Sequence, residues 1–323
     1  MKKKRSSFDT KVSYNTSVMN KDKKILVVAG GPVTKLDAFR DTAKGMGLTN
    51  VVCASLYDLH YYSEGTSGEL VIKIGNHDIA DFDIVYIRVV GKRLEIASVL
   101  VDYAKSHGVR LVDEIYNDPQ MMPSTISKAM EMKMLAESGI PIPATYFGSL
   151  DSIMNNAEEL LGFPFVLKGT VGRKARTVWS PTTKKELEAL VNDLRANEKQ
   201  GANYFAQKLI PAQTRARVLV VGGEVIGGIV RPTKFRKRFI EKVNGEYPEG
   251  KKETLTTVPD SYAELAIKTA KAAKLDVCGV DILHEDETDN LYIIEANAAP
   301  AWKLVEKHNE VNVEEKILEF LIK

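Results

Sequence analysis

The residues best suited to chemistry lie in segment 279–300, GVDILHEDETDNLYIIEANAAP. Its two short apolar runs, joined by a polar turn, predict a β-hairpin. Because side chains alternate along a strand, Glu295 and Asn297 share one face, and strand pairing would bring Asp281 beside them. Two carboxylates and an amide oxygen form an all-oxygen set that suits Mg²⁺ or Mn²⁺ and leaves coordination positions for waters and nucleotide phosphates. The alternative is an ordinary hairpin with polar edges.

The order of these residues also resembles a known family. An Asp, a short loop, then Glu-x-Asn followed by Pro is similar to the metal-binding end of the ATP-grasp superfamily, and above all to the RimK-like carboxylate–amine ligases. The resemblance implies an ATP-grasp fold of mixed α/β and α+β class, in which two α+β subdomains clasp ATP after a small parallel-sheet domain. It implies ATP and one or two Mg²⁺ (or Mn²⁺) ions as cofactors, with Asp281, Glu295 and Asn297 as the metal ligands.

Two lysines match positions that approach nucleotide phosphates in this family. Lys128 stands eight residues before the alanine of a segment similar to the family's "LA..GIP.P.T", and its alternative is a surface lysine on an amphipathic helix. Lys168 ends an apolar strand, where a lysine needs a negative partner such as an ATP phosphate. The loop that follows carries Arg173, Lys174 and Arg176 where the family has more glycines. Such a lid would hold phosphate by side-chain charge more than by backbone amides.

The segment YFAQKLI, residues 204–210, resembles the hinge that holds adenine in the family. The resemblance makes Gln207, Lys208 and Leu209 candidate nucleotide contacts, with the backbone of Lys208 and Leu209 pairing with the adenine edge. Lys208 replaces the family's glutamate, which weakens the expected hold on the nucleotide.

The segment RARVLVVGGEVIGGIVR, residues 215–231, predicts a hairpin around a Gly-Gly turn. It resembles the family's "D-I-R-x-L-V-V-G" block, with Arg217 and Arg231 at the matched arginine positions and Arg215 in place of the aspartate. A guanidinium group can hold phosphate oxygens bidentately and stays charged at any working pH. Arg217 and Arg231 are therefore our catalytic candidates, stabilising the transferring group or an acyl phosphate. The alternative is a pair of arginines on a solvated strand face.

Four regions are expected to position these residues. Residues 1–23 are expected to form a disordered basic tail and residues 24–117 an α/β domain. Residues 118–206 would form a first ATP-grasp subdomain with the lid, and residues 207–323 a second with the metal site. In the second region, alternating strand and helix patterns predict a parallel sheet, while the signal between residues 55 and 80 is weak. Arg88, at the end of one strand, is either a substrate contact or a salt-bridged surface arginine.

Composition is that of a soluble globular protein, with 44% hydrophobic and 27% charged residues among 323. No apolar run reaches the roughly 18 residues of a membrane helix. Two cysteines, Cys53 and Cys278, form neither a disulfide framework nor a zinc pattern, so we expect a cytoplasmic protein with free thiols. The net charge of +2 says little about partners.

The resemblance implies a carboxylate–amine ligase that forms an amide or peptide bond through an acyl phosphate. Its substrates would be a carboxylate and an amine, and the amine would be an amino acid or a peptide. We expect no association with a membrane, and binding to nucleic acid is disfavoured. The chain could form a homo-oligomer. One alternative is a catalytically impaired nucleotide-binding module, motivated by Lys208, Arg215 and the glycine-poor lid. A weaker one is a nucleic-acid-associated protein, based on the basic tail and the run KFRKRFIEK, residues 234–242, beyond which Asn244 is a candidate phosphate contact.

Overall fold

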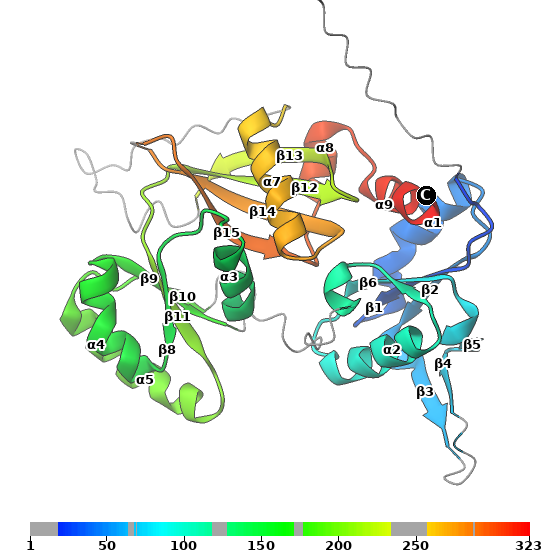
Figure 1. Cartoon of the computed structure of the whole chain (residues 1–323), viewed down its shortest axis with the longest axis horizontal. Coiled ribbons are helices and arrows are strands. Elements are labelled where there is room, and N and C mark those ends of the chain that lie inside the picture. The colour runs from blue at the N-terminus through cyan, green and yellow to red at the C-terminus, as the bar shows by residue number, and fades with distance from the viewer. Residues whose placement is uncertain are drawn as a thin grey trace, which may run out of the picture.

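A computed structural model of the chain describes residues 19–63, 68, 70–117, 128–170, 177–233, 257–286 and 288–323 (Figure 1). Three predictions lie outside these ranges: most of the basic tail (1–18), the charged loop after Lys168 (171–176), and the basic run 234–242 with Asn244. Residues 19–23, which we predicted as the end of the tail, belong to the folded part. The Asn20 amide there donates to the carbonyl oxygen of Ile322 (2.8 Å).

The predicted parallel sheet is confirmed. Its strands run in the order β2-β1-β6-β7, with bounds β1 Ile25–Ala29, β2 Val51–Ser55, β6 Ile84–Val89 and β7 Arg110–Leu111. Alternate residues of β1 pack towards helix α1 (Asp37–Gly45) on one face and α2 (Leu94–Ser106) on the other. Because both faces are covered, all five residues of β1 are buried, which is why this strand is continuously apolar.

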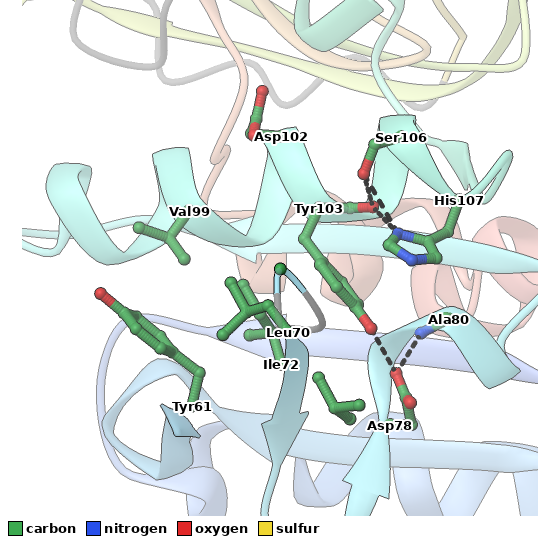
Figure 2. Close-up of a pocket in the computed structure, with 12 residues that line it drawn as sticks. Tyr61, Leu70, Ile72, Asp78, Ala80, Val99, Asp102, Tyr103, Ser106 and His107 are labelled. Carbon is green, nitrogen blue, oxygen red and sulfur yellow. Dashed lines mark hydrogen bonds between the residues drawn. The ribbon is translucent and has the colours of Figure 1, made fainter. Parts of the chain in front are cut away.

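A small antiparallel sheet occupies the stretch where the sequence signal was weak. It comprises β3 Leu59–Tyr62, β4 Val71–Ile74 and β5 His77–Asp78, flanked by short 3₁₀ turns at Leu56–Asp58 and Ile79–Asp81. Two further 3₁₀ turns, Val33–Leu36 and Glu114–Asn117, follow β1 and β7 of the parallel sheet. A hollow of about 790 Å³ lies between the small antiparallel sheet and α2. Within it the Tyr103 hydroxyl (3.2 Å) and the Ala80 amide (2.8 Å) both donate to Asp78 Oδ1 (Figure 2). None of the residues that line it belongs to the predicted site.

The middle of the chain forms a separate antiparallel sheet, β10-β9-β11-β8, with its own core (Figure 1). The strands are β8 Thr145–Gly148, β9 Phe165–Gly169, β10 Val178–Trp179 and β11 Tyr204–Lys208, packed against helices α4 Leu150–Leu161 and α5 Lys184–Lys199. Each helix begins at a side-chain cap, Ser149 for α4 and Thr183 for α5.

The last part of the chain forms the antiparallel sheet β13-β12-β14-β15, which confirms both predicted hairpins. Its strands are β12 Thr214–Val221, β13 Glu224–Pro232, β14 Val277–His284 and β15 Leu291–Asn297. The associated helices are α3 Lys128–Glu137, α7 Asp260–Ala272, α8 Lys303–Asn309 and α9 Val313–Ile322.

The apolar core joins the first and last parts of the chain. One cluster of buried residues includes strand β1 and helix α1 together with strands of the last sheet and helix α9. Within it the ring of Phe39 meets Tyr86 and Trp302 edge to face, at centroid distances of 6.0 and 6.1 Å. The parallel sheet and the last sheet therefore share one buried cluster, in which α9 packs on both α1 and β12, while the middle sheet keeps a core of its own.

A pair of aspartates, of which Asp113 is buried and Asp276 is half-buried, links the same two parts. The Asp113 amide donates to Asp276 Oδ2 (2.8 Å), and the amides of Asp276 and Val277 donate to Asp113 Oδ1 (2.9 and 3.0 Å). Burial raises the pKa of Asp113 to about 7. Cys278, one residue further on, is buried and Cys53 is half-buried, both as free thiols. Among the described helices, none has both the length and the apolar character needed to cross a bilayer.

Candidate active site

The predicted site residues of the last sheet lie on one face of it. Asp281 on β14 pairs with Glu295 on β15 and with Arg217 on β12, and Asn297 lies two residues beyond Glu295. Residues directly opposite on paired strands share a face, as do residues two apart on one strand. The predicted meeting of Asp281 and Glu295 is thus confirmed, and the structure adds Arg217 beside them.

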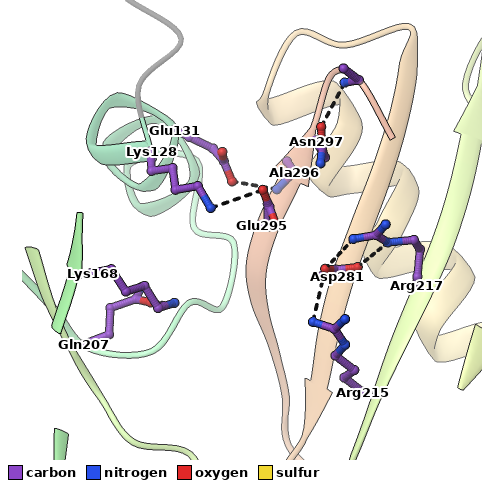
Figure 3. A network of polar contacts seen from close by, with 11 residues as sticks. Lys128, Glu131, Lys168, Gln207, Arg215, Arg217, Asp281, Glu295, Ala296 and Asn297 are labelled. Atoms are coloured by element: carbon purple, nitrogen blue, oxygen red, sulfur yellow. Dashed lines mark hydrogen bonds and ion pairs between the residues drawn. The ribbon is translucent and has the colours of Figure 1, made fainter. Parts of the chain in front are cut away.

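Asp281 is buried and held by arginines. Arg217 donates from Nε to Oδ1 and from Nη2 to Oδ2, both at 2.7 Å, and Arg215 Nη1 lies 3.8 Å from Oδ2 (Figure 3). Burial lowers the pKa of Arg217, but the hydrogen bonds and charge of Asp281 outweigh it and the net pKa is raised. A carboxylate that is 1% exposed is stable here because this two-pronged partner satisfies it.

Glu295 faces the first turn of helix α3. Lys128 Nζ lies 3.3 Å from Glu295 Oε1, so the lysine predicted to approach phosphate contacts a predicted metal ligand (Figure 3). One helical turn later, Glu131 accepts a hydrogen bond from the Ala296 amide (2.6 Å). Burial, and then the nearby charge of Glu295, raise the pKa of Glu131 to about 8.

Glu131 is a site residue that our sequence reasoning missed. It stands three positions after Lys128, so the two side chains share a face of α3. That spacing was a visible signal, but it is common on surface helices.

The donor set of Asp281, Glu295 and Asn297 fits a hard divalent cation in charge and chemistry. The Asn297 side-chain oxygen already accepts a hydrogen bond from the Ala299 amide (2.9 Å). Within the described ranges, no three Asp, Glu, His or Cys side chains converge as a metal cluster, and the third ligand of the predicted set is the amide oxygen of Asn297. Two carboxylates supplemented by waters and phosphates is a usual mode for Mg²⁺.

Lys168 lies on the facing sheet, within electrostatic reach of Lys128 and Glu295. Its ammonium group donates to Gln207 Oε1, and Gln207 Nε2 in turn donates to Thr145 Oγ1 (2.9 Å). Burial first, then the charge of Lys128, lower the pKa of Lys168 to about 8. Gln207 is therefore placed as the partner of this lysine.

The hinge residues Lys208 and Leu209 follow directly. Lys208 ends β11 with an exposed side chain, and its amide donates to the carbonyl oxygen of Ala144 (2.8 Å). That amide is used within the protein. An adenine edge at the hinge would therefore have to use the Lys208 carbonyl and the Leu209 backbone.

Arg231 on β13 pairs with Arg215 on β12 and is half-buried. Arg88, in contrast, contacts the segment that follows β15. Its Nη2 donates to the carbonyl oxygen of Pro300 (2.6 Å), and its guanidinium stacks 3.6 Å from the Trp302 ring centroid. It ties the parallel sheet to the turn after β15.

Comparisons with known proteins agree with this arrangement. The model of a family described as the RimK-like ATP-grasp domain matches residues 125–321, more than half of the chain. The chain is 30% identical to human N-acetylaspartylglutamate synthase A over 240 residues, 72% of this chain and 58% of that protein. It is 26% identical to a probable alpha-L-glutamate ligase of Thioalkalivibrio sulfidiphilus over 269 residues, 81% of this chain and 84% of that protein. The chain spans 56% to 59% of the length of its vertebrate relatives.

Among solved structures, the ATP-grasp ligase PsnB in complex with a minimal precursor, Mg and ADP superposes with a TM-score of 0.64 at 16% identity, over 93% of this chain and 98% of that one. This likeness confirms the ATP-grasp fold expected from the sequence.

Proposed function

The chain belongs to the RimK-like ATP-grasp family, and from this premise we propose that it is an ATP- and Mg²⁺-dependent carboxylate–amine ligase. It joins a carboxylate to an amine, an amino acid or a peptide, and the product is an amide or peptide bond. The carboxylate attacks the γ-phosphorus of ATP to give an acyl phosphate and ADP, and the amine then displaces phosphate. The relatives named as glutamate ligases, and the precursor and ADP bound to PsnB, support this substrate class.

One observation carries the proposal: cations from three elements face the two paired carboxylates of the last sheet. Lys128 comes from α3, Lys168 from β9 and Arg217 from β12, around Asp281 and Glu295 (Figure 3). Positively charged groups placed around hard oxygen ligands are what a metal-bound triphosphate needs, since phosphoryl transfer depends on positioning and charge neutralisation.

Each side chain has a role in this proposal. Asp281, Glu295 and Asn297 would hold Mg²⁺, which would supply positive charge to neutralise the phosphates. Lys128 and Lys168 bind phosphate oxygens. Arg217 and Arg231 stabilise the transferring group. The backbone of Lys208 and Leu209 receives the adenine edge, and Gln207 contributes to nucleotide binding by holding Lys168.

The test is ADP release by the purified chain, supplied with ATP, Mg²⁺ and pools of amino acids, peptides and small acids. We expect release that depends on both an acid and an amine, and that is lost in Glu295→Gln. Full turnover by that variant would contradict the metal assignment. The matched control is Glu137→Gln, which removes an exposed carboxylate paired with Lys133 on the same helix as Lys128.

A second candidate is a nucleotide-binding module without ligase activity. The full engagement of Asp281 by Arg217 favours it, because a metal ligand paired this closely has to exchange its partner before it can bind metal. This candidate predicts a Mg²⁺-dependent rise in Tm with ATP and no ADP release with any acceptor pool.

A further inference from the structure

Two arginines on the site face are directly opposed. Arg215 on β12 and Arg231 on β13 form a cross-strand pair, and Arg217 lies two residues along on the same face. Opposed side chains on paired strands have Cβ atoms roughly 5 Å apart, where like charges are destabilising. Three guanidinium groups thus gather at one end of the sheet.

The described residues do not supply enough negative charge for all three. Asp281 is the carboxylate beside them, and Arg217 takes both of its oxygens. Arg215 Nη1 lies 3.8 Å from Asp281 Oδ2, which is too far for a hydrogen bond, and the Arg215 side chain is only 19% exposed to solvent. The Nε atoms of Arg215 and Arg231 are both buried, and neither has a hydrogen-bond partner in the described part of the chain.

Buried donors on a charged group are costly when they are left unpaired, more so than neutral ones. Burial, and then the charges of Arg215 and Arg217, lower the pKa of Arg231. An oxyanion that accepts from both guanidinium groups would satisfy these donors and offset the repulsion, because arginine holds carboxylate or phosphate bidentately.

We propose that Arg215 and Arg231 form a subsite for a second negatively charged group of the ligase substrate. The proposal rests on the ligase function proposed above. It narrows the substrate to molecules with at least two anionic groups: the carboxylate that is activated, and a further carboxylate or phosphate held at this pair. Arg231 borders the transferring group on one side and the subsite on the other, whereas Arg215 serves the subsite alone.

The test measures anion binding by the full chain saturated with ADP and Mg²⁺. The probes are dicarboxylates from succinate to adipate, each beside its monoamide, and inorganic phosphate. We expect at least one dicarboxylate to bind about tenfold more tightly than its monoamide, as a charge-assisted hydrogen-bonded pair would give. In Arg215→Gln this advantage disappears while ADP binding remains, and in Arg215→Lys it is reduced.

The phosphate arm identifies the oxyanion. Phosphate binding that is stronger than that of every dicarboxylate and that depends on Arg215 assigns the subsite to a phosphate group; the reverse order assigns it to a carboxylate. The matched control is Arg40→Gln, which removes an exposed arginine paired with Asp37 (2.7 Å) and should leave all probe affinities unchanged. The ADP-induced rise in Tm of each variant shows that it is folded.

The outcomes separate the two proposals. If ADP with Mg²⁺ fails to bind the unaltered chain, the ligase proposal fails. If ADP binds but no dianion is favoured, or if Arg215→Gln keeps the preference, the subsite is wrong and the ligase proposal stands. A loss of affinity for a non-hydrolysable ATP analogue in Arg215→Gln, without any effect on the dianions, would assign Arg215 to the triphosphate and overturn the subsite.

Discussion

Arg217 and Asp281 face each other on neighbouring strands and are joined by two hydrogen bonds of 2.7 Å, so a predicted phosphate ligand and a predicted metal ligand are each other's partner. Lys128 on helix α3 and Glu295 on strand β15 repeat this relationship, with Lys128 Nζ 3.3 Å from Glu295 Oε1. In our proposal a metal-bound nucleotide replaces both pairs at once: the cation takes the carboxylates and the phosphates take the lysine and the arginine.

Replacing Asp281 with Asn should be strongly destabilising. The change leaves the buried charge of Arg217 without its counter-charge, and breaking a buried ion pair costs about 3 to 5 kcal/mol. Urea unfolding measures the loss, and ADP binding should no longer depend on Mg²⁺. The control Asp37→Asn breaks an exposed pair with Arg40 and should cost about 0.5 kcal/mol or less. Equal effects of the two variants would contradict the importance of the buried pair.

Lys168 should make stability rise with pH above about 8. Its pKa in the folded protein is lowered to about 8, whereas a free lysine titrates near ~10.4. Between these values the unfolded chain binds the extra proton, so the free energy of unfolding increases as pH rises. ADP affinity should fall over the same range, because the uncharged amine no longer attracts phosphate. Lys168→Met should flatten both profiles.

The measurements for Lys168 are urea unfolding and ADP titration at pH 7 to 10. Lys133→Met, which removes an exposed lysine paired with Glu137, serves as the control and should keep the profiles of the unaltered chain. A Lys168→Met profile parallel to that of the unaltered chain would refute the assignment.

Glu131 should act in the opposite direction at lower pH. Its pKa is raised to about 8, so between the ordinary carboxyl pKa of ~4.3 and pH 8 the folded state holds a proton that the unfolded chain has lost. The free energy of unfolding should therefore fall as pH rises through this range. Glu131→Gln keeps the acceptor for the Ala296 amide and should remove that slope, as measured by unfolding at pH 4.5 to 8. An unchanged slope would count against a neutral Glu131.

Gly30 and Gly31 give a matched pair of backbone tests. A Cβ at Gly30 would lie 1.8 Å from the carbonyl oxygen of Val90, because the Gly30 amide donates to the neighbouring Val89 oxygen (2.6 Å). A Cβ at Gly31 would meet only the flexible end of Lys35 (2.7 Å). We expect Gly30→Ala to cost about 3 kcal/mol or to prevent folding, and Gly31→Ala to cost about 1 kcal/mol at most, by urea unfolding. Similar costs would show that the segment directly after β6, which carries Val90, can move aside.

Local sequence patterns predicted the strands that hold the site, but not every contact between those strands. Alternation along β14 and β15 is a local property, so the meeting of Asp281 and Glu295 could be read from the sequence. The pairing of Arg217 with Asp281 could not, because it depends on the register between strands whose residues are 64 positions apart. The arginine was assigned to phosphate alone for that reason.

The small sheet β3-β4-β5 was missed for another reason. Strand β4 has only four residues with alternate burial, and β5 has two, which is too short for a periodic signal. The position of this sheet depends on Ile72 and Ile74, which join the same buried cluster as residues of α2. It does not depend on the β-propensity of the strands themselves.

The packing of α9 on α1 has a consequence for how the chain is made. The inner face of the parallel sheet is completed by Ile317, Leu321 and their neighbours, which are synthesised long after β1. During translation α1 and α2 can cover the two faces of β1 early, whereas the apolar side of α1 that packs on α9 stays exposed until α9 has been made. Contacts between segments so far apart in the sequence form slowly, so we expect the packing of α9 on α1 to be a late step of folding.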